Sequence, residues 1–307
     1  MDFSSWSIGI VFAKCLLYLG YAAGIGGPFC LVLSSSNPLF VLRLCRYTLS
    51  LVCIGLITAL CIFYLQVGSL SDSGLAGITD ALMFNILWNS NAGSALVWQL
   101  SGFLCLLVGA IFQFRPFVTQ QIANQAISQD KWIRVLTGCM LVTGATLIAI
   151  SIAIVGHTAQ LTTQLKFVIG LHVVCVAWWI GSLWPLFEAC RILDNVAVFE
   201  LMNRFSKAAA GFVGVLIVAG AILIYKLVPT WHALVQSDYG RILVVKLILV
   251  VMILLIAARH KWQLAPKLLT VPSSIHALRR SIALESVFAL TIFVTTAVLT
   301  TMVGPEH

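Results

Sequence analysis

Long apolar runs separated by short polar connections constrain this chain more than any other feature of its sequence. A membrane-spanning helix needs about 20 mostly apolar residues. In lipid, only helices or closed barrels satisfy the hydrogen bonds of the backbone, and continuous apolar runs of this length are typical of helices. We expect eight spanning helices, over residues 6–33, 41–67, 93–114, 133–156, 165–189, 207–228, 241–259 and 280–302.

The composition agrees with lipid as the solvent. Hydrophobic residues make up 61% of the chain and charged residues 9%, whereas a soluble domain carries about 25% charged residues. The sequence therefore predicts an all-α, polytopic membrane bundle, with residues 1–307 as a single transmembrane domain. Between the second and third spans, residues 80–90 predict a short interfacial helix.

The positive charges predict the orientation of the bundle, since cytoplasmic connections carry an excess of Lys and Arg. Thirteen of the 18 Lys and Arg residues flank the connections between spans 1–2, 3–4, 5–6 and 7–8. Only Lys166, Lys226 and Arg241 flank the opposite connections. We therefore expect both termini on the periplasmic side.

The sequence also excludes several classes of function. The net charge is +8, but the basic residues lie at span ends rather than along one stripe, so nucleic-acid binding is not expected. The chain has no phosphate-binding loop, no HExxH zinc motif, no CxxCH haem attachment and no nucleophile elbow. We expect neither ATP use nor enzymatic activity.

Two histidines near the outer face form the leading candidate metal site. His157 is where the fourth span reaches that face, and His172 lies about 10 Å down the fifth span. Imidazole is a common ligand of copper, zinc and iron. Cys175 and Trp179 share the helix face of His172, and a thiol there would favour Cu(I). The alternative is a solvated His157 and a His172 that hydrogen-bonds a neighbouring helix.

The other histidines are weaker candidates. His232 and His307 are expected on the outer side, where either could complete a metal site or simply be solvated. His260 and His276 follow or precede positive charges on the inner side, which predicts a place at the lipid-headgroup boundary.

Three charged residues fall within the predicted spans. Lys14 and Lys246 enter from the outer side and Glu285 from the inner side, and such groups normally pair or line a polar path. Lys246 could instead extend outward toward Arg241. For Glu285, the expected partners are the arginines near the inner boundary, Arg259, Arg279 and Arg280.

A series of short motifs gives the chain a family resemblance. In chain order these are Gly156-His157-Thr158, Leu171-His172, Trp179-Ile180-Gly181-Ser182-Leu183, Arg204-Phe205-Ser206-Lys207-Ala208, Tyr239-Gly240-Arg241-Ile242-Leu243 with Lys246, and Arg279-Arg280 with Glu285. With these motifs the chain resembles the copper resistance protein D family of bacterial inner-membrane proteins. The resemblance is best over residues 130–302, and Thr158 replaces a small alanine of the family pattern.

The resemblance implies a protein that handles copper ions on the periplasmic side of the inner membrane, with His157 and His172 matching the family's histidines. It also implies a periplasmic copper-binding partner of the copper resistance protein C type. Our leading hypothesis is copper uptake from the periplasm through the bundle. One alternative is a membrane redox protein in which His157 and His172 are axial ligands of b-type haem. Another is a scaffold or sensor in which these histidines are structural.

Overall fold

The computed structural model describes residues 4–34, 37–71, 73–123, 131–156, 160–227, 237–271 and 273–302. Within these ranges there is no strand, and eight helices are long and apolar enough to cross a membrane, which confirms the all-α fold and the predicted number of spans. The elements are α1 (Ser5–Leu33), α2 (Pro38–Leu70), η1 (Gly74–Thr79), α3 (Ala81–Trp88), α4 (Asn91–Ala123), α5 (Lys131–Ala153), α6 (Thr163–Ile192), α7 (Asn195–Leu227), α9 (Asp238–Arg259), η3 (His260–Leu264), α10 (Ala265–Lys267) and α11 (Ser274–Leu299).

Local sequence explains where several helices begin. The Ser4 side chain accepts a hydrogen bond from the backbone N–H of Ser7 at the start of α1, and Asn37 caps α2 in the same way. Asp80 accepts from the first N–H groups of α3, the predicted short helix before the third span. Such caps satisfy donors that have no partner inside the helix.

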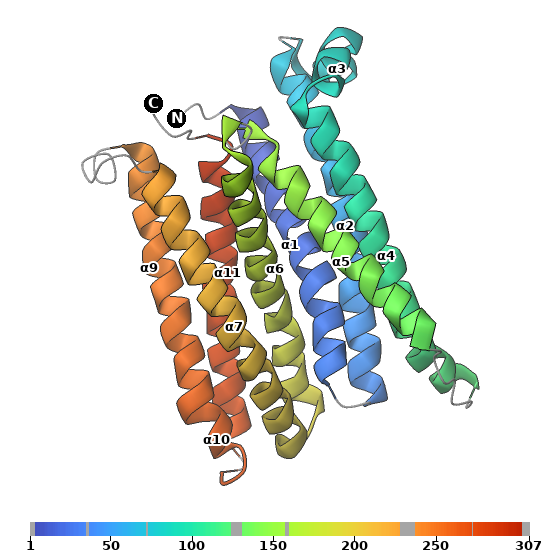
Figure 1. The fold of residues 1–307 in the computed structure, drawn as a ribbon, viewed down its shortest axis with the longest axis vertical. Coiled ribbons are helices and arrows are strands. Elements are labelled where there is room, and N and C mark those ends of the chain that lie inside the picture. The colour runs from blue at the N-terminus through green and yellow to red at the C-terminus, as the bar shows by residue number, and fades with distance from the viewer. Residues whose placement is uncertain are drawn as a thin grey trace.

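The spanning helices lie side by side in one bundle (Figure 1). The first helix, α1, packs against α2, α6 and α11, while α4 and α5 lie at one edge and α7 and α9 lie at the other. The start of α1 and the end of α11 are at the same end of the bundle. The periplasmic location of that end remains a prediction from the positive charges.

Glycines allow α1 to approach its neighbours closely, because small residues leave room for the backbone of a second helix. A Cβ atom added to Gly20 would lie 2.7 Å from the Cα of Gly55 on α2. On α6, a Cβ added to Gly181 would collide with the backbone carbonyl of Ala22. The helix also continues through Pro28, whose carbonyl accepts a hydrogen bond from the side chain of Gln113, 2.9 Å away.

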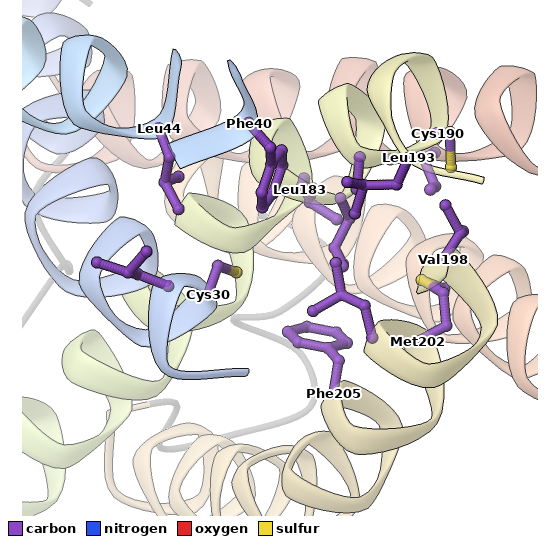
Figure 2. Close-up of a cluster of buried hydrophobic side chains, with 14 of the residues drawn as sticks. Cys30, Phe40, Leu44, Leu183, Cys190, Leu193, Val198, Met202 and Phe205 are labelled. Carbon is purple, nitrogen blue, oxygen red and sulfur yellow. The ribbon is translucent and has the colours of Figure 1, made fainter. Parts of the chain in front are cut away.

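A large apolar cluster holds the C-terminal helices to α1 and α2 (Figure 2). In it, Cys30 of α1 and Phe40 of α2 face Leu183 of α6, and Met202 and Phe205 of α7 complete the contact. Each of these side chains is buried. The cluster therefore fixes the position of α6 relative to α7.

The seventh span extends beyond the residues that its apolar run predicts. The run ends at residue 259, whereas the helical chain continues through η3, a π-helical turn, into α10. A π-helical turn widens the helix by one residue and often occurs at functional sites. Its first residue, His260, therefore stays inside the bundle.

Candidate metal site and intramembrane polar network

The His172 ring, on α6, faces α7 rather than lipid. A Cβ atom built on Gly220 of α7 would lie 3.7 Å from the ring's Cε1 and 3.9 Å from its Nδ1. The ring also approaches the backbone of Leu216, and Lys246 of α9 is close enough to interact with it electrostatically. Two of the ionisable residues that the sequence places within spans are thus brought together.

One nitrogen of His172 has no hydrogen-bond partner. Nδ1 is buried and unpaired among the residues that the structure describes. A neutral imidazole carries a hydrogen on one ring nitrogen and a lone pair on the other, so Nδ1 can offer its lone pair to a ligand. Most buried polar atoms are paired with protein, water or an ion. The unpaired Nδ1 is therefore a candidate ligand for a metal ion.

The structure describes only part of the predicted metal site. His157, His232 and His307 lie outside the described residues. Cys175 is a buried free thiol about one turn along α6 from His172. Within the described ranges, no three His, Cys, Asp or Glu side chains are placed together to hold a metal.

Lys14 connects the first and last spanning helices. Its Nζ donates to the carbonyl oxygen of Thr300, 3.0 Å away, and lies 3.2 Å from the Thr300 hydroxyl. Thr300 is the C-cap of α11, and a positive charge is favourable at the C-terminus of a helix. This contact gives Lys14 a structural role.

The predicted partners of Glu285 are wrong. Its carboxylate, only 2% exposed, accepts from Nε1 of Trp179 at 3.0 Å and lies 3.2 Å from Nδ1 of His260. On the other side of the His260 ring, Nε2 is 2.8 Å from the hydroxyl oxygen of Ser281. Ser281 precedes Glu285 by four residues and so shares its helix face, whereas Arg279 and Arg280 project from other faces.

The predicted place of His260 at the headgroup boundary is also wrong. The side chain is buried, because the π-helical turn η3 continues the helix past Arg259 and directs the ring toward α11. His276, by contrast, is exposed at the start of α11. We refer to Trp179, His260, Ser281 and Glu285 as the inner network.

A pocket of about 460 Å³ adjoins the inner network. It lies between α6, α7, α11 and the end of α9 with η3, and Trp179, His260 and Glu285 line it together with Met202 and Asn203. Trp179 follows His172 by about two helical turns, so the two side chains leave α6 on the same face. Polar groups therefore occur along this side of α6 from His172 to the pocket.

The sequence gives only a weak signal for the inner network. The spacing of Ser281 and Glu285 puts both on one face of α11. Trp179 and His260, however, come from other helices, and no local pattern pairs them with Glu285. A second buried acid, Glu188 of α6, forms ion pairs with Arg43 of α2 and Arg191. Arg43 is distant in sequence, so its pairing with Glu188 also depends on how the helices pack.

Comparisons with known proteins identify both halves of the chain. The family model described as "Copper resistance protein D-like, N-terminal domain" matches residues 4–167. The model described as "Copper resistance protein D" matches residues 199–299. A relative, the copper transport protein CutJ of Bacillus subtilis (strain 168), is 26% identical over 161 residues. That match covers 50% of this chain and 29% of the relative's length. No solved structure matches the chain.

Proposed function

Because this chain belongs to the copper resistance protein D family, we propose that it transports copper ions across the inner membrane, from the periplasm toward the cytoplasm. Eight helices within the described ranges are long and apolar enough to span a membrane, which makes it a multi-pass membrane protein. A relative that matches half of the chain is named as a copper transport protein, which supports transport rather than enzymatic catalysis.

The unpaired Nδ1 of His172 carries the proposal. A buried ring nitrogen without a partner is costly in a membrane span, and binding of a copper ion would offset that cost. The neighbouring thiol of Cys175 is a soft donor suited to Cu(I). His157 would supply the ligand nearer the membrane surface, where the ion enters.

Lys246 would limit how tightly the ion is held. Its ammonium group is within electrostatic range of His172, and like charges repel more strongly in a low-dielectric interior than in water. A transport site must bind its ion well enough for entry and weakly enough for release. In this proposal, Lys246 favours release of copper along α6 toward the pocket.

The donor of copper would be a small periplasmic copper-binding protein of the copper resistance protein C type. Delivery from such a partner would occur at the bundle end where α1 begins and α11 ends, because that end is predicted to face outward. The helix α6 begins at that end (Figure 1), and along it His172 comes before Trp179 of the inner network.

Copper accumulation in cells tests the proposal. Cells that lack their own copy of the protein would express the wild type, the His157→Ala/His172→Ala variant, or His276→Ala as a control. We expect the double variant to lose the protein-dependent accumulation of copper at a normal protein level, and the exposed His276→Ala control to retain it. Equal accumulation in the wild type and the double variant would contradict a transport role for these histidines.

A further inference from the structure

Copper binding at His172 does not explain the buried contacts among His260, Ser281 and Glu285. From the geometry of His260, Glu285 and Ser281, we propose that these residues form a proton-binding site that exchanges protons with water in the adjoining pocket. The site is separate from His172, and its ligand is the proton itself.

The first argument concerns charge. Glu285 is buried, and its oxygens face Trp179 and His260. The indole N–H of Trp179 supplies a hydrogen bond but no positive charge, so a carboxylate beside a neutral His260 leaves one uncompensated charge inside the bundle. A second proton on the His260 ring would balance that charge, and an unbalanced buried charge is strongly unfavourable.

Few other charged groups near the pocket could balance the charge of Glu285. Among the described residues that line the pocket, the titratable groups are His260, Glu285 and Lys261. Lys261 belongs to η3 and is exposed. The pocket-lining residues of α6 and α7 include Trp179, Asn203 and Ser206 but no titratable group, and Glu285 is the one titratable residue that α11 adds to the described lining. His260 is therefore the buried group placed to neutralise Glu285.

The second argument concerns hydrogen bonding. When the His260 ring is neutral, with its N–H on Nδ1 directed at Glu285, the Ser281 hydroxyl can donate to Nε2. When a proton from pocket water forms an N–H bond at Nε2, the hydroxyl can rotate and accept from it. Loss of that proton to water restores the first arrangement. Neither state leaves a ring nitrogen without a partner, so protonation costs no hydrogen bond.

The third argument concerns access. Both His260 and Glu285 line the pocket, whose volume of about 460 Å³ is ample for several water molecules. Asn203, Ser206 and Lys261 add polar groups to its lining. The π-helical turn places His260 at this position, and buried Glu and His residues in membrane helices are typical of proton relays.

Nitrogen-15 NMR of histidine-labelled, full-length protein in lipid nanodiscs would test the proposal. The chain has six histidines, so the His260 signal is the one that His260→Gln removes. We expect this signal to change from the neutral to the doubly protonated form as the pH is lowered stepwise. A His260 signal that keeps one form throughout would overturn the proposal.

Two variants test the cause of that change. In Glu285→Gln, the ratio of protonated to neutral His260 at a fixed pH should fall, because the opposite charge is gone. In Ser281→Ala the ratio should also fall, since an unpaired charged donor costs more than an unpaired lone pair. The exposed His276→Gln control should leave the ratio unchanged. An unchanged ratio in both Glu285→Gln and Ser281→Ala would overturn the assignment.

A link between proton binding at His260 and copper movement would rest on the function proposed above. The proton site and the proposed copper transport can, however, be disproved separately. Copper uptake with a His260 that does not titrate would overturn the proton site alone. A titrating His260 in a protein that moves no copper would support the proton site and overturn the proposed transport. In coupled transport, His260→Gln should abolish the pH dependence of copper uptake.

Discussion

A histidine inside a membrane span needs partners from other helices, and His172 finds them on α7 and α9. Its ring lies against Gly220, and its buried Nδ1 has no hydrogen-bond partner there. A larger residue at that position would remove the unpaired nitrogen from contact with a ligand. The backbone of α7 is thus as much a part of the proposed copper site as the imidazole ring.

The substitution Gly220→Ala tests this description at the scale of one methyl group. The new Cβ would sit 3.9 Å from Nδ1, an ordinary van der Waals distance, so the fold should tolerate it. We expect copper accumulation to fall by about tenfold, the equivalent of about 1.4 kcal/mol of lost binding. The matched control is Gly214→Ala on the same helix, where the added Cβ meets nothing within 4 Å.

Accumulation would be measured at equal protein levels in both variants. A Gly220→Ala protein that accumulates copper as the wild type does, with the Gly214→Ala control also normal, would show that Nδ1 does not need to be accessible from α7.

At the scale of the element, the spans are predictable and the contacts between them are not. Apolar runs of the right length are enough to locate eight helices, because the bilayer fixes their length and excludes other structures. The partner of Glu285 depends instead on how α6, η3 and α11 pack. A run that becomes polar at Arg259 gives no indication that a π-helical turn keeps the next residue, His260, inside the bundle.

The contact between α1 and α6 makes a prediction about helix packing. Gly181 lies against the carbonyl of Ala22, so Gly181→Ala must push the helices apart. We expect a loss of about 1–3 kcal/mol of stability, seen as a lower unfolding temperature of the purified protein in detergent. Gly138→Ala on α5, with open space around the added Cβ, should change the unfolding temperature little.

A wild-type unfolding temperature in Gly181→Ala would mean that α1 and α6 have room to separate at no cost. The central place of α1 in the bundle would then not depend on close contact at this glycine.

At the scale of the whole molecule, the arrangement of the helices shows which end of the bundle holds both ends of the spanning region, and the distribution of charge predicts which side of the membrane that end faces. The structure places the start of α1 and the end of α11 at one end of the bundle, as an even number of spans requires. The excess of Lys and Arg at the opposite end predicts that this shared end faces the periplasm. His172 then lies in the outer half of the membrane and the inner network in the inner half.

Reporter fusions would test this orientation. A phosphatase that is active only outside the cytoplasm, fused after residue 307, should be active, and the same enzyme inserted after Asp194 between α6 and α7 should be inactive. The reverse pattern would place His172 on the cytoplasmic side and would contradict uptake from a periplasmic donor.

The site is predictable from sequence to a more limited extent than the fold. A histidine within an apolar run marks His172 as unusual, since such residues rarely occur in lipid without a function. Its closeness to Lys246 and Gly220 arises from three helices that are separate in sequence, so this contact cannot be predicted from the sequence alone. The contacts of the inner network cannot be predicted from the sequence for the same reason.

The copper content and optical spectrum of the purified protein test the central claim most directly. We predict that wild-type protein exposed to copper and then washed retains copper, that the His157→Ala/His172→Ala variant loses it, and that neither shows a Soret band. Equal copper in the two proteins would contradict a copper site at His172. A Soret band in the wild type that the double variant lacks would instead identify the histidines as ligands of b-type haem.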